Sequence, residues 1–170
     1  MLIWINLTEQ ERFNMKAKIV VHTQSGNTAK FAREISEKLN NRGIENEIAL
    51  LRPTESPKPN SKNVELKRIP DIDGFDTIIL GCPVWGLTAS PVILAYIDSF
   101  SSMKGKKIIP FATFGLPFKF MGASKALKVM TQKCDTLLGD VLPGYSLHTF
   151  TVKFNNNKLS DISERIASSV

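Results

Sequence analysis

The chain is poor in the side chains from which metal sites and disulfide frameworks are built. Its 170 residues include two cysteines, Cys82 and Cys134, two histidines, His22 and His148, and no C-x-x-C pair. Two cysteines do not make the disulfide framework of a small secreted domain, and so few soft ligands do not favour a structural zinc site. No apolar run approaches the roughly 20 residues of a membrane-spanning helix. We therefore expect a reduced, cytoplasmic protein with no metal site and no membrane span.

Acidic residues are also scarce, both overall and locally. The chain has 22 Lys and Arg against 16 Asp and Glu, and residues 101–134 contain seven lysines and no acidic residue. These lysines are either solvated side chains of helices and turns or a basic rim beside a site for an anionic ligand or an acidic partner. Nucleic-acid binding is not expected, because it would rest on the charge alone without a groove-reading motif.

The first fourteen residues show no pattern that joins them to the rest of the chain. The opening MLIWINL is apolar but short, lacks a basic start and runs into polar residues, which is not typical of a signal peptide. Met15 would serve as a natural start. We interpret residues 1–14 as an N-terminal extension, either non-native or disordered, and residues 15–170 as one domain of ordinary length.

Strand-like and helix-like segments alternate along the chain. Five segments have the length and apolar pattern of strands: residues 17–22, 44–51, 77–82, 107–113 and 144–153. Helical periodicity begins after Thr28, at Pro91, at Ala123 and at about Lys158. Residues 52–70, with four prolines, form a long connection that holds at most a short helical turn. This alternation predicts an α/β fold in which a parallel sheet has helices on both faces.

Several positions carry local signals. Gly43 stands where a helix C-cap glycine belongs, and Ser90 with Pro91 provides an N-cap and a first-turn proline. Pro110 conflicts with a strand over residues 107–113, because proline cannot donate to a sheet ladder. A bulge, or a strand that begins after Pro110, would resolve the conflict.

Three loops leave the predicted carboxyl ends of strands, where open α/β sheets bind their ligands. The first loop, Thr23 to Thr28, places hydroxyl and amide side chains around Gly26 just before a helix. The free amides and the dipole of a helix N-terminus favour a phosphate there. The loop lacks the lysine of a Walker A motif. It is therefore either a phosphate loop with neutral donors or a polar N-cap turn.

The other two loops are aromatic. Residues 83–89 contain Trp85, and residues 114–122 contain three phenylalanines. An aromatic at a strand end is more often a core or rim residue than a stacking platform, and three phenylalanines on an irregular loop either cover the core or line an apolar cleft. Phosphate donors beside two aromatic loops suit a ligand with a phosphate tail and a flat, apolar ring. Flavin mononucleotide (FMN) has both parts.

The three loops resemble those of the flavodoxin family. VHTQSGNT matches the family's T-x-[ST]-G-N-T phosphate loop, and CPVWG resembles its second, ring-contacting loop. FATFGLPFKFMG resembles, more loosely, the third loop of flavodoxin-like proteins of anaerobic bacteria. The resemblance covers roughly residues 15–168. It implies a three-layer, doubly wound, five-stranded parallel sheet of order 2-1-3-4-5 with non-covalently bound FMN.

The resemblance also implies which residues hold the cofactor, and it implies no catalytic residue. The phosphate would lie on the first loop and the ring between the second and third loops. Trp85 would contact the ring, and Gly86 would be the hinge of the peptide that bonds flavin N5, because glycine tolerates the dihedrals required. The implied FMN-binding residues are Thr23, Gln24, Ser25, Gly26, Asn27, Thr28, Pro83, Val84, Trp85, Gly86, Leu87, Phe114, Gly115 and Gly122.

The chain departs from the family pattern in two ways. Family carriers are usually strongly acidic whereas this chain is basic, and the familiar stacking tyrosine of the third loop is missing, because only Tyr96 and Tyr145 occur. A basic surface favours the anionic reduced flavin. We therefore expect a less negative second reduction potential than in acidic flavodoxins.

Two functions remain open at this point. The first is an FMN oxidoreductase that passes electrons from NAD(P)H to a quinone or similar small-molecule acceptor, with the lysines of residues 101–134 steering the anionic nucleotide; no motif encodes nicotinamide binding. The alternative is a non-catalytic electron carrier or flavin-binding regulatory module, with a redox protein as donor and an acidic protein as acceptor.

Other proteins of this fold class need residues that the chain lacks. A receiver domain needs an acidic cluster at strand ends, and a low-molecular-weight phosphatase needs a cysteine near an arginine, which neither Cys82 nor Cys134 has. We interpret Cys82 as a small buried residue, His22 as locally hydrogen-bonded and His148 as part of a strand.

Overall fold

The computed structural model describes residues 14–170. The extension predicted for residues 1–14 therefore lies, apart from Asn14, outside the described residues. No helix among the described residues is long and apolar enough to cross a membrane. Nor does this part of the chain contain three His, Cys, Asp or Glu side chains grouped so that they could hold a metal ion.

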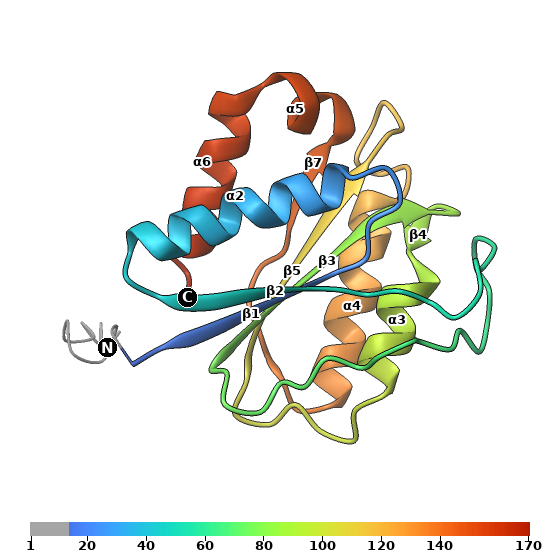
Figure 1. Cartoon of the computed structure of the whole chain (residues 1–170). Coiled ribbons are helices and arrows are strands. Elements are labelled where there is room, and N and C mark those ends of the chain that lie inside the picture. Colours follow the sequence, from blue (N-terminus) through green and yellow to red (C-terminus); the bar gives the residue numbers. More distant parts are fainter. Residues whose placement is uncertain (1–13) are drawn as a thin grey trace, which may run out of the picture.

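The centre of the fold is a parallel sheet with five strand positions (Figure 1). Its strands are β1 (Lys16–Val21), β2 (Glu45–Leu50), β3 (Thr77–Trp85), β5 (Lys107–Phe114) and a fifth strand in two pieces, β6 (Asp140–Val141) and β7 (Tyr145–His148). The strands lie in the order β2-β1-β3-β5, with β6 and β7 both paired to β5. The predicted order 2-1-3-4-5 is thus confirmed, and β2 is the edge strand.

Helices cover both faces of the sheet (Figure 1). α2 (Asn27–Asn41), α5 (Thr149–Phe154) and α6 (Asn156–Ala167) enclose one apolar cluster with the sheet, and α3 (Pro91–Asp98) and α4 (Ala123–Thr136) enclose the other. Three large side chains of α2 are buried at the predicted spacing, Phe31, Ile35 and Leu39. Because successive strand residues point to opposite faces, β1 and β3 supply both clusters.

Two of the local signals form as predicted. Gly43 has a φ of +74° just after α2, and its amide bonds the carbonyl of Asn40, as expected of a glycine that ends a helix. The hydroxyl of Ser90 accepts from the amide of Ile93 at 3.4 Å, with Pro91 in the first turn of α3.

Pro110 lies inside β5 without a bulge, contrary to both of the predicted resolutions. The amide of Leu142 donates to the carbonyl of Ile108, so the alternation of a strand turns the nitrogen of Pro110 toward the fifth strand as well. The fifth strand is interrupted there, because β6 pairs only as far as Ile108 and β7 pairs from Phe111 onward. Pro110, which has no amide hydrogen to donate, therefore lies opposite the interruption between β6 and β7, where no strand residue is paired with it.

The segment 83–88, predicted as a loop, is instead a β-hairpin. β3 continues to Trp85 and pairs antiparallel with β4 (Thr88–Ala89). The two turn residues, Gly86 and Leu87, have φ values of +61° and +64°. Positive φ at both central residues is the type I′ geometry that closes a two-residue hairpin, and leucine at the second position concealed it from sequence reading.

The strand predicted over residues 144–153 is wrong in its second half. β7 ends at His148, and α5 follows at once. The Nδ1 atom of His148 accepts from the amide of Phe150 at 3.1 Å and so caps the helix. The alternation of Phe150, Val152 and Phe154 imitates a strand, but only Val152 is buried.

The connection from residue 51 to 76 contains no helix, although a parallel crossover usually does. It folds back on itself instead. Pro53 and Leu66 form an antiparallel bridge, the amide of Thr54 donates to the carbonyl of Glu65, and the amide of Lys67 donates to that of Arg52, both at 2.9 Å.

Candidate functional site at the carboxyl edge of the sheet

The three loops that follow β1, β3 and β5 lie together at the carboxyl edge of the sheet (Figure 1). The hydroxyl of Thr28 bonds that of Thr113 at 2.8 Å, which ties the first loop to the end of β5. The rings of His22 and Trp85 lie 6.2 Å apart at an interplanar angle of 27°, beside the first and second loops. A Cβ on Gly122 would come within 2.5 Å of Val84 Cγ1, so the end of the third loop packs on the hairpin.

The first loop is open to solvent at its tip. Gln24, Ser25 and Gly26 are exposed, and a Cβ added to Gly26 would meet no atom within 4 Å. Gly26 has a φ of +84°, precedes α2, and carries no side chain with which to cap the helix. The first turn of α2 contains no acidic residue. Its amides and the helix dipole are therefore directed at an anion-binding position.

Other members of the first loop hold it in place. The Thr28 hydroxyl is buried against Thr113, and Asn27 is 7% exposed with its Nδ2 donating to Ser25 Oγ at 2.9 Å. Thr23 Oγ1 accepts a long bond from the amide of Ala29 at 3.4 Å. Of the side chains predicted to donate, those of Gln24 and Ser25 are exposed to solvent, whereas the Thr28 hydroxyl is engaged with Thr113.

His22 connects the first loop to the second through Ser90. Its Nδ1 lies 2.9 Å from Ser90 Oγ, across 68 residues, so the prediction of a local bond is wrong. Ser90 Oγ also accepts from the amide of Ile93, so one hydroxyl links the end of β1 to the first turn of α3. Burial disfavours the charged imidazolium and lowers the pKa of His22 to about 4.

The hairpin is braced by the long connection after β2. A Cβ on Gly86 would come within 2.7 Å of Asn60 Nδ2 and 3.0 Å of Pro59 Cβ. Any side chain at residue 86 would be strained by the positive φ and crowded by this contact. Pro83, Val84 and Trp85 are partly exposed, and Leu87 is 53% exposed at the turn.

The third loop begins at a buried anchor and ends at an exposed tip. The ring of Phe114 is 5% exposed and meets that of His148 edge to face at 5.2 Å. Because Nδ1 of His148 accepts from Phe150, Nε2 carries the proton and donates to the carbonyl of Gly115 at 3.1 Å. Phe118 and Phe120 stack on each other at 5.4 Å and are 57% and 77% exposed, so these two rings do not cover the core.

A family comparison matches the part of the chain that builds the second and third loops. The model of the family described as Flavodoxin matches residues 53–156, more than half of the chain. The chain belongs to the flavodoxin family. The first loop, residues 23–28, lies before the matched segment.

Solved structures share the fold of this chain at low sequence identity. Oxidised flavodoxin 2 from Bacillus cereus matches with a TM-score of 0.69 and 15% identity, covering 90% of this chain and 95% of that one. A candidate flavoprotein from Bacteroides uniformis has a TM-score of 0.65 and 21% identity, covering 82% and 96%. Two-electron reduced Megasphaera elsdenii flavodoxin has 0.61 and 19%, covering 89% and 98%.

FMN is the cofactor of the flavodoxin family, and the carboxyl edge of the sheet in this chain fits it. The first loop offers amides at a helix N-terminus around an uncrowded glycine, which suits a phosphate. Beside it, Trp85 is partly exposed on the hairpin. Neutral hydrogen-bond donors on one side and an accessible aromatic on the other match the two halves of the cofactor.

The three loops and the segments next to them contain no Asp or Glu (residues 22–33, 82–97, 99–134 and 141–160), whereas the connection that braces the hairpin carries the exposed Glu55. Their lysines do not form one basic rim, however. Lys104, Lys106 and Lys107 lie at the amino end of β5, where two of them bond backbone carbonyls. Lys133 pairs with Asp98. Lys119 and Lys125 remain exposed on the third loop and the first turn of α4.

The side chain of Cys82 does not reach this site. Its side chain is fully buried on β3, with Sγ 3.7 Å from Met130 Sδ. Burial raises the pKa of its thiol to about 12, so it is the small buried residue that the sequence predicts.

Four residues that support this site were not predicted from the sequence: Thr113, Ser90 as the partner of His22, His148 and Asn60. Each acts through a contact across 26 or more residues, such as Thr28 with Thr113 or His148 with Gly115. The only available signal was that Thr113 and Gly115 flank Phe114 at the end of a strand.

Proposed function

We propose that the chain is an FMN-dependent electron carrier that docks an anionic partner at the carboxyl edge of its sheet. FMN, when bound, supplies the capacity to accept and release electrons. Residues 23–28 would hold its phosphate, chiefly through backbone amides and Ser25. The ring would contact Trp85, Gly86 and Leu87 on one side and the segment from Phe114 to Gly122 on the other.

The charge of the three loops carries the proposal. Residues 22–33, 82–97, 99–134 and 141–160 contain no acidic residue, while Lys119 and Lys125 are exposed. A surface of one charge attracts a partner of the other and accelerates encounter at low ionic strength. Family carriers use acidic surfaces, so this chain would meet a different partner, one whose docking surface is acidic.

Turnover with NAD(P)H is the second candidate, and the structure gives it less support. It depends on steering of the nucleotide by the lysines of residues 101–134. Four of these seven lysines lie at the amino end of β5 or in an ion pair with Asp98. A carrier reduced by a protein needs no nucleotide site, so we favour the carrier.

Anaerobic spectroscopy separates the two functions. FMN-loaded protein is mixed with NADPH and then with NADH, and the oxidised flavin band is followed against free FMN. If the protein is a carrier, neither nucleotide bleaches its flavin band faster than that of free FMN. Bleaching faster than that of free FMN would instead identify a reductase.

Charged oxidants test the docking charge directly. Photoreduced FMN-loaded protein is oxidised by the hexacyanoferrate(III) anion or by the tris(phenanthroline)cobalt(III) cation, each at increasing salt. We expect added salt to slow oxidation by the anion and to accelerate oxidation by the cation. The variant Lys119→Glu/Lys125→Glu should weaken both trends, whereas Lys104→Glu/Lys106→Glu, at the amino end of β5, should preserve them. Opposite salt trends in the unmodified protein would contradict the proposal.

A further inference from the structure

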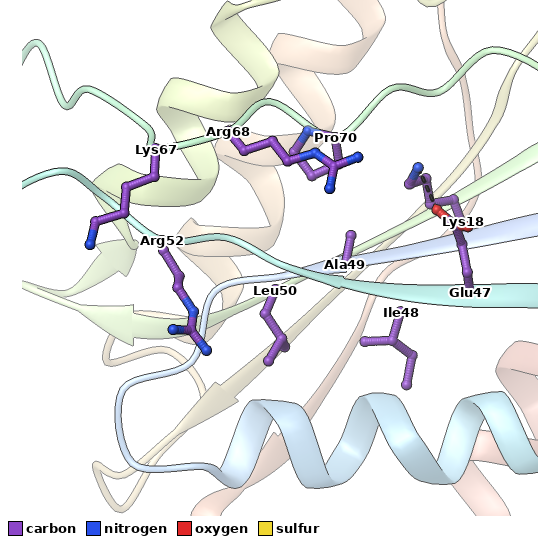
Figure 2. A pocket seen from close by; sticks show the side chains of 9 residues that line it. All are labelled: Lys18, Glu47, Ile48, Ala49, Leu50, Arg52, Lys67, Arg68 and Pro70. Atoms are coloured by element: carbon purple, nitrogen blue, oxygen red, sulfur yellow. Dashed lines mark ion pairs between the residues drawn. The ribbon is translucent and has the colours of Figure 1, made fainter.

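A groove unrelated to the three loops runs along the outer edge of β2 (Figure 2). It has a volume of about 470 Å³ and is lined on one side by β2 and on the other by the returning segment from Lys67 to Pro70. The two sides separate below the bond from the Lys67 amide to the Arg52 carbonyl. The chain thus begins to add an antiparallel partner to β2 and then diverges from it.

The backbone of β2 faces this groove with groups that a further strand would use. The amide of Leu51 donates to the carbonyl of Val21 on β1. The alternation of a strand therefore turns the backbone groups of Ile48 and Leu50 away from β1 and toward the groove. In the part of the chain that the structure describes, β2 has no strand on this side. Such an edge is a template for an extended segment.

The charge of the groove selects which segment can enter. Arg52, Lys67 and Arg68 are exposed and take part in no ion pair within residues 14–170. The fourth cation of the groove, Lys18, is neutralised by Glu47, and its amine lies 4.7 Å from the centre of the Phe75 ring. The lining therefore carries a net excess of three positive charges. This excess repels another copy of the same basic edge and attracts an acidic segment.

The arrangement of the cations favours an extended ligand over a small anion. Figure 2 shows Arg52 and Lys67 at one end of the groove, while Arg68 reaches over it toward Pro70 and the Lys18–Glu47 pair occupies the far end. The cationic heads do not converge on one point, as a phosphate cradle requires. They follow β2 from Glu47 to Arg52, a run of about 17 Å at the rise of a strand.

We propose that this groove binds an extended acidic segment of a partner protein as an additional strand on β2. The segment would exchange backbone hydrogen bonds with Ile48 and Leu50. Its carboxylates would lie against Arg52, Lys67 and Arg68. None of the residues that line the groove belongs to the three loops, so this binding does not depend on the proposed electron transfer.

The proposal is tested with a defined probe on FMN-supplemented, full-length protein. The probe is fluorescein-labelled Val-Glu-Val-Glu-Val, followed by anisotropy at low salt and by amide shifts in ¹⁵N-labelled protein. We expect saturable binding with the largest shifts at Ile48 and Leu50. A peptide N-methylated on alternate residues, which cannot pair with a strand edge, should bind at least tenfold more weakly.

Matched variants separate local from general charge effects. Arg52→Glu/Arg68→Glu should weaken peptide binding at least tenfold, whereas Lys104→Glu/Lys128→Glu, with the same change in net charge, should stay within twofold. Equal losses in the two variants, or equal binding of the N-methylated peptide, would reduce the groove to a general basic surface and overturn the proposal. Tighter binding of pyrophosphate with the same shifts would assign a small-anion site instead. Absence of saturable peptide binding would also reject it.

Discussion

The first and third loops face the same edge of the sheet, yet the core holds them very differently. In residues 23–28, the side chains of Asn27 and Thr28 are buried, and Thr28 bonds Thr113 inside the sheet. In residues 115–122, the two aromatic side chains at the tip are more than half exposed. The loop is tied by the His148–Gly115 bond and by the packing of Gly122.

This difference indicates that the two halves of the cofactor site are organised separately. The first loop, which we propose holds the phosphate, is braced without a ligand by the Thr28–Thr113 and Asn27–Ser25 side-chain hydrogen bonds. The ring half keeps exposed aromatic surface that a flat ligand or a partner can cover. Preorganisation of the first loop reduces the ordering cost of binding, so we expect the phosphate to contribute a large share of the affinity for FMN.

The largest effect expected from a change of pH concerns His22, which lies directly before the first loop. Its pKa is about 4 in the folded chain against about 6.5 when unfolded. The unfolded chain therefore binds more protons between these values, and stability present above pH 6.5 is lost as the pH falls toward 4. The loss is up to about 3 kcal/mol. Urea unfolding of the unmodified chain and of His22→Gln at pH 7 and pH 4.5 measures it; an identical pH dependence in both would contradict the assignment.

The next effect tests the phosphate half with two ligands. Ser25→Asp places a carboxylate beside the proposed phosphate position, and we expect FMN to bind at least about 100-fold more weakly, or roughly 2.7 kcal/mol. The affinity for riboflavin, which lacks the phosphate, should change less than threefold. Calorimetric titration gives both affinities, with Ser168→Asp as a control far from the loop. An equal loss for both ligands would show that the loop does not hold the phosphate.

The tie between the first loop and β5 is tested by a double-mutant cycle. Thr28→Val leaves the Thr113 hydroxyl buried without its partner and should destabilise the fold by about 1–3 kcal/mol. Thr113→Val made in the Thr28→Val protein should then lower the free energy of unfolding by less than Thr113→Val made alone, because the double variant leaves no hydroxyl unsatisfied. Denaturant unfolding of the four proteins gives the coupling. Strictly additive losses would mean that the 2.8 Å contact does not support the loop.

The smallest effect on stability is expected at the tip of the third loop. Phe118→Ser/Phe120→Ser removes two exposed rings and should change the free energy of unfolding by less than about 0.5 kcal/mol. Phe114→Ser, which removes a buried ring, should cost about 3–5 kcal/mol. A large loss in the double variant would show that the tip is part of the folded core, and the comparison between the two loops would fail.

Sequence periodicity was sufficient for the order of the elements and for most strands. It failed at two places. The alternation of Phe150, Val152 and Phe154 resembles that of a strand, although these residues form α5, and leucine at residue 87 is not typical of a hairpin turn. The loops of the site were identified because their residue types report a local need for amides, hydroxyls or aromatic rings. Their supports could not be found, because the contacts of His22, Thr28 and His148 depend on pairing across 33 to 85 residues.

The central claim is that the carboxyl edge of the sheet holds the flavin phosphate on the first loop. Titration of ¹⁵N-labelled protein with FMN tests this directly. We expect saturable shifts of the amides of Ser25, Gly26 and Asn27 and of the Trp85 indole, with riboflavin moving the indole but not the three amides. Shifts confined to the groove along β2, or equal shifts of the three amides with both ligands, would contradict the account.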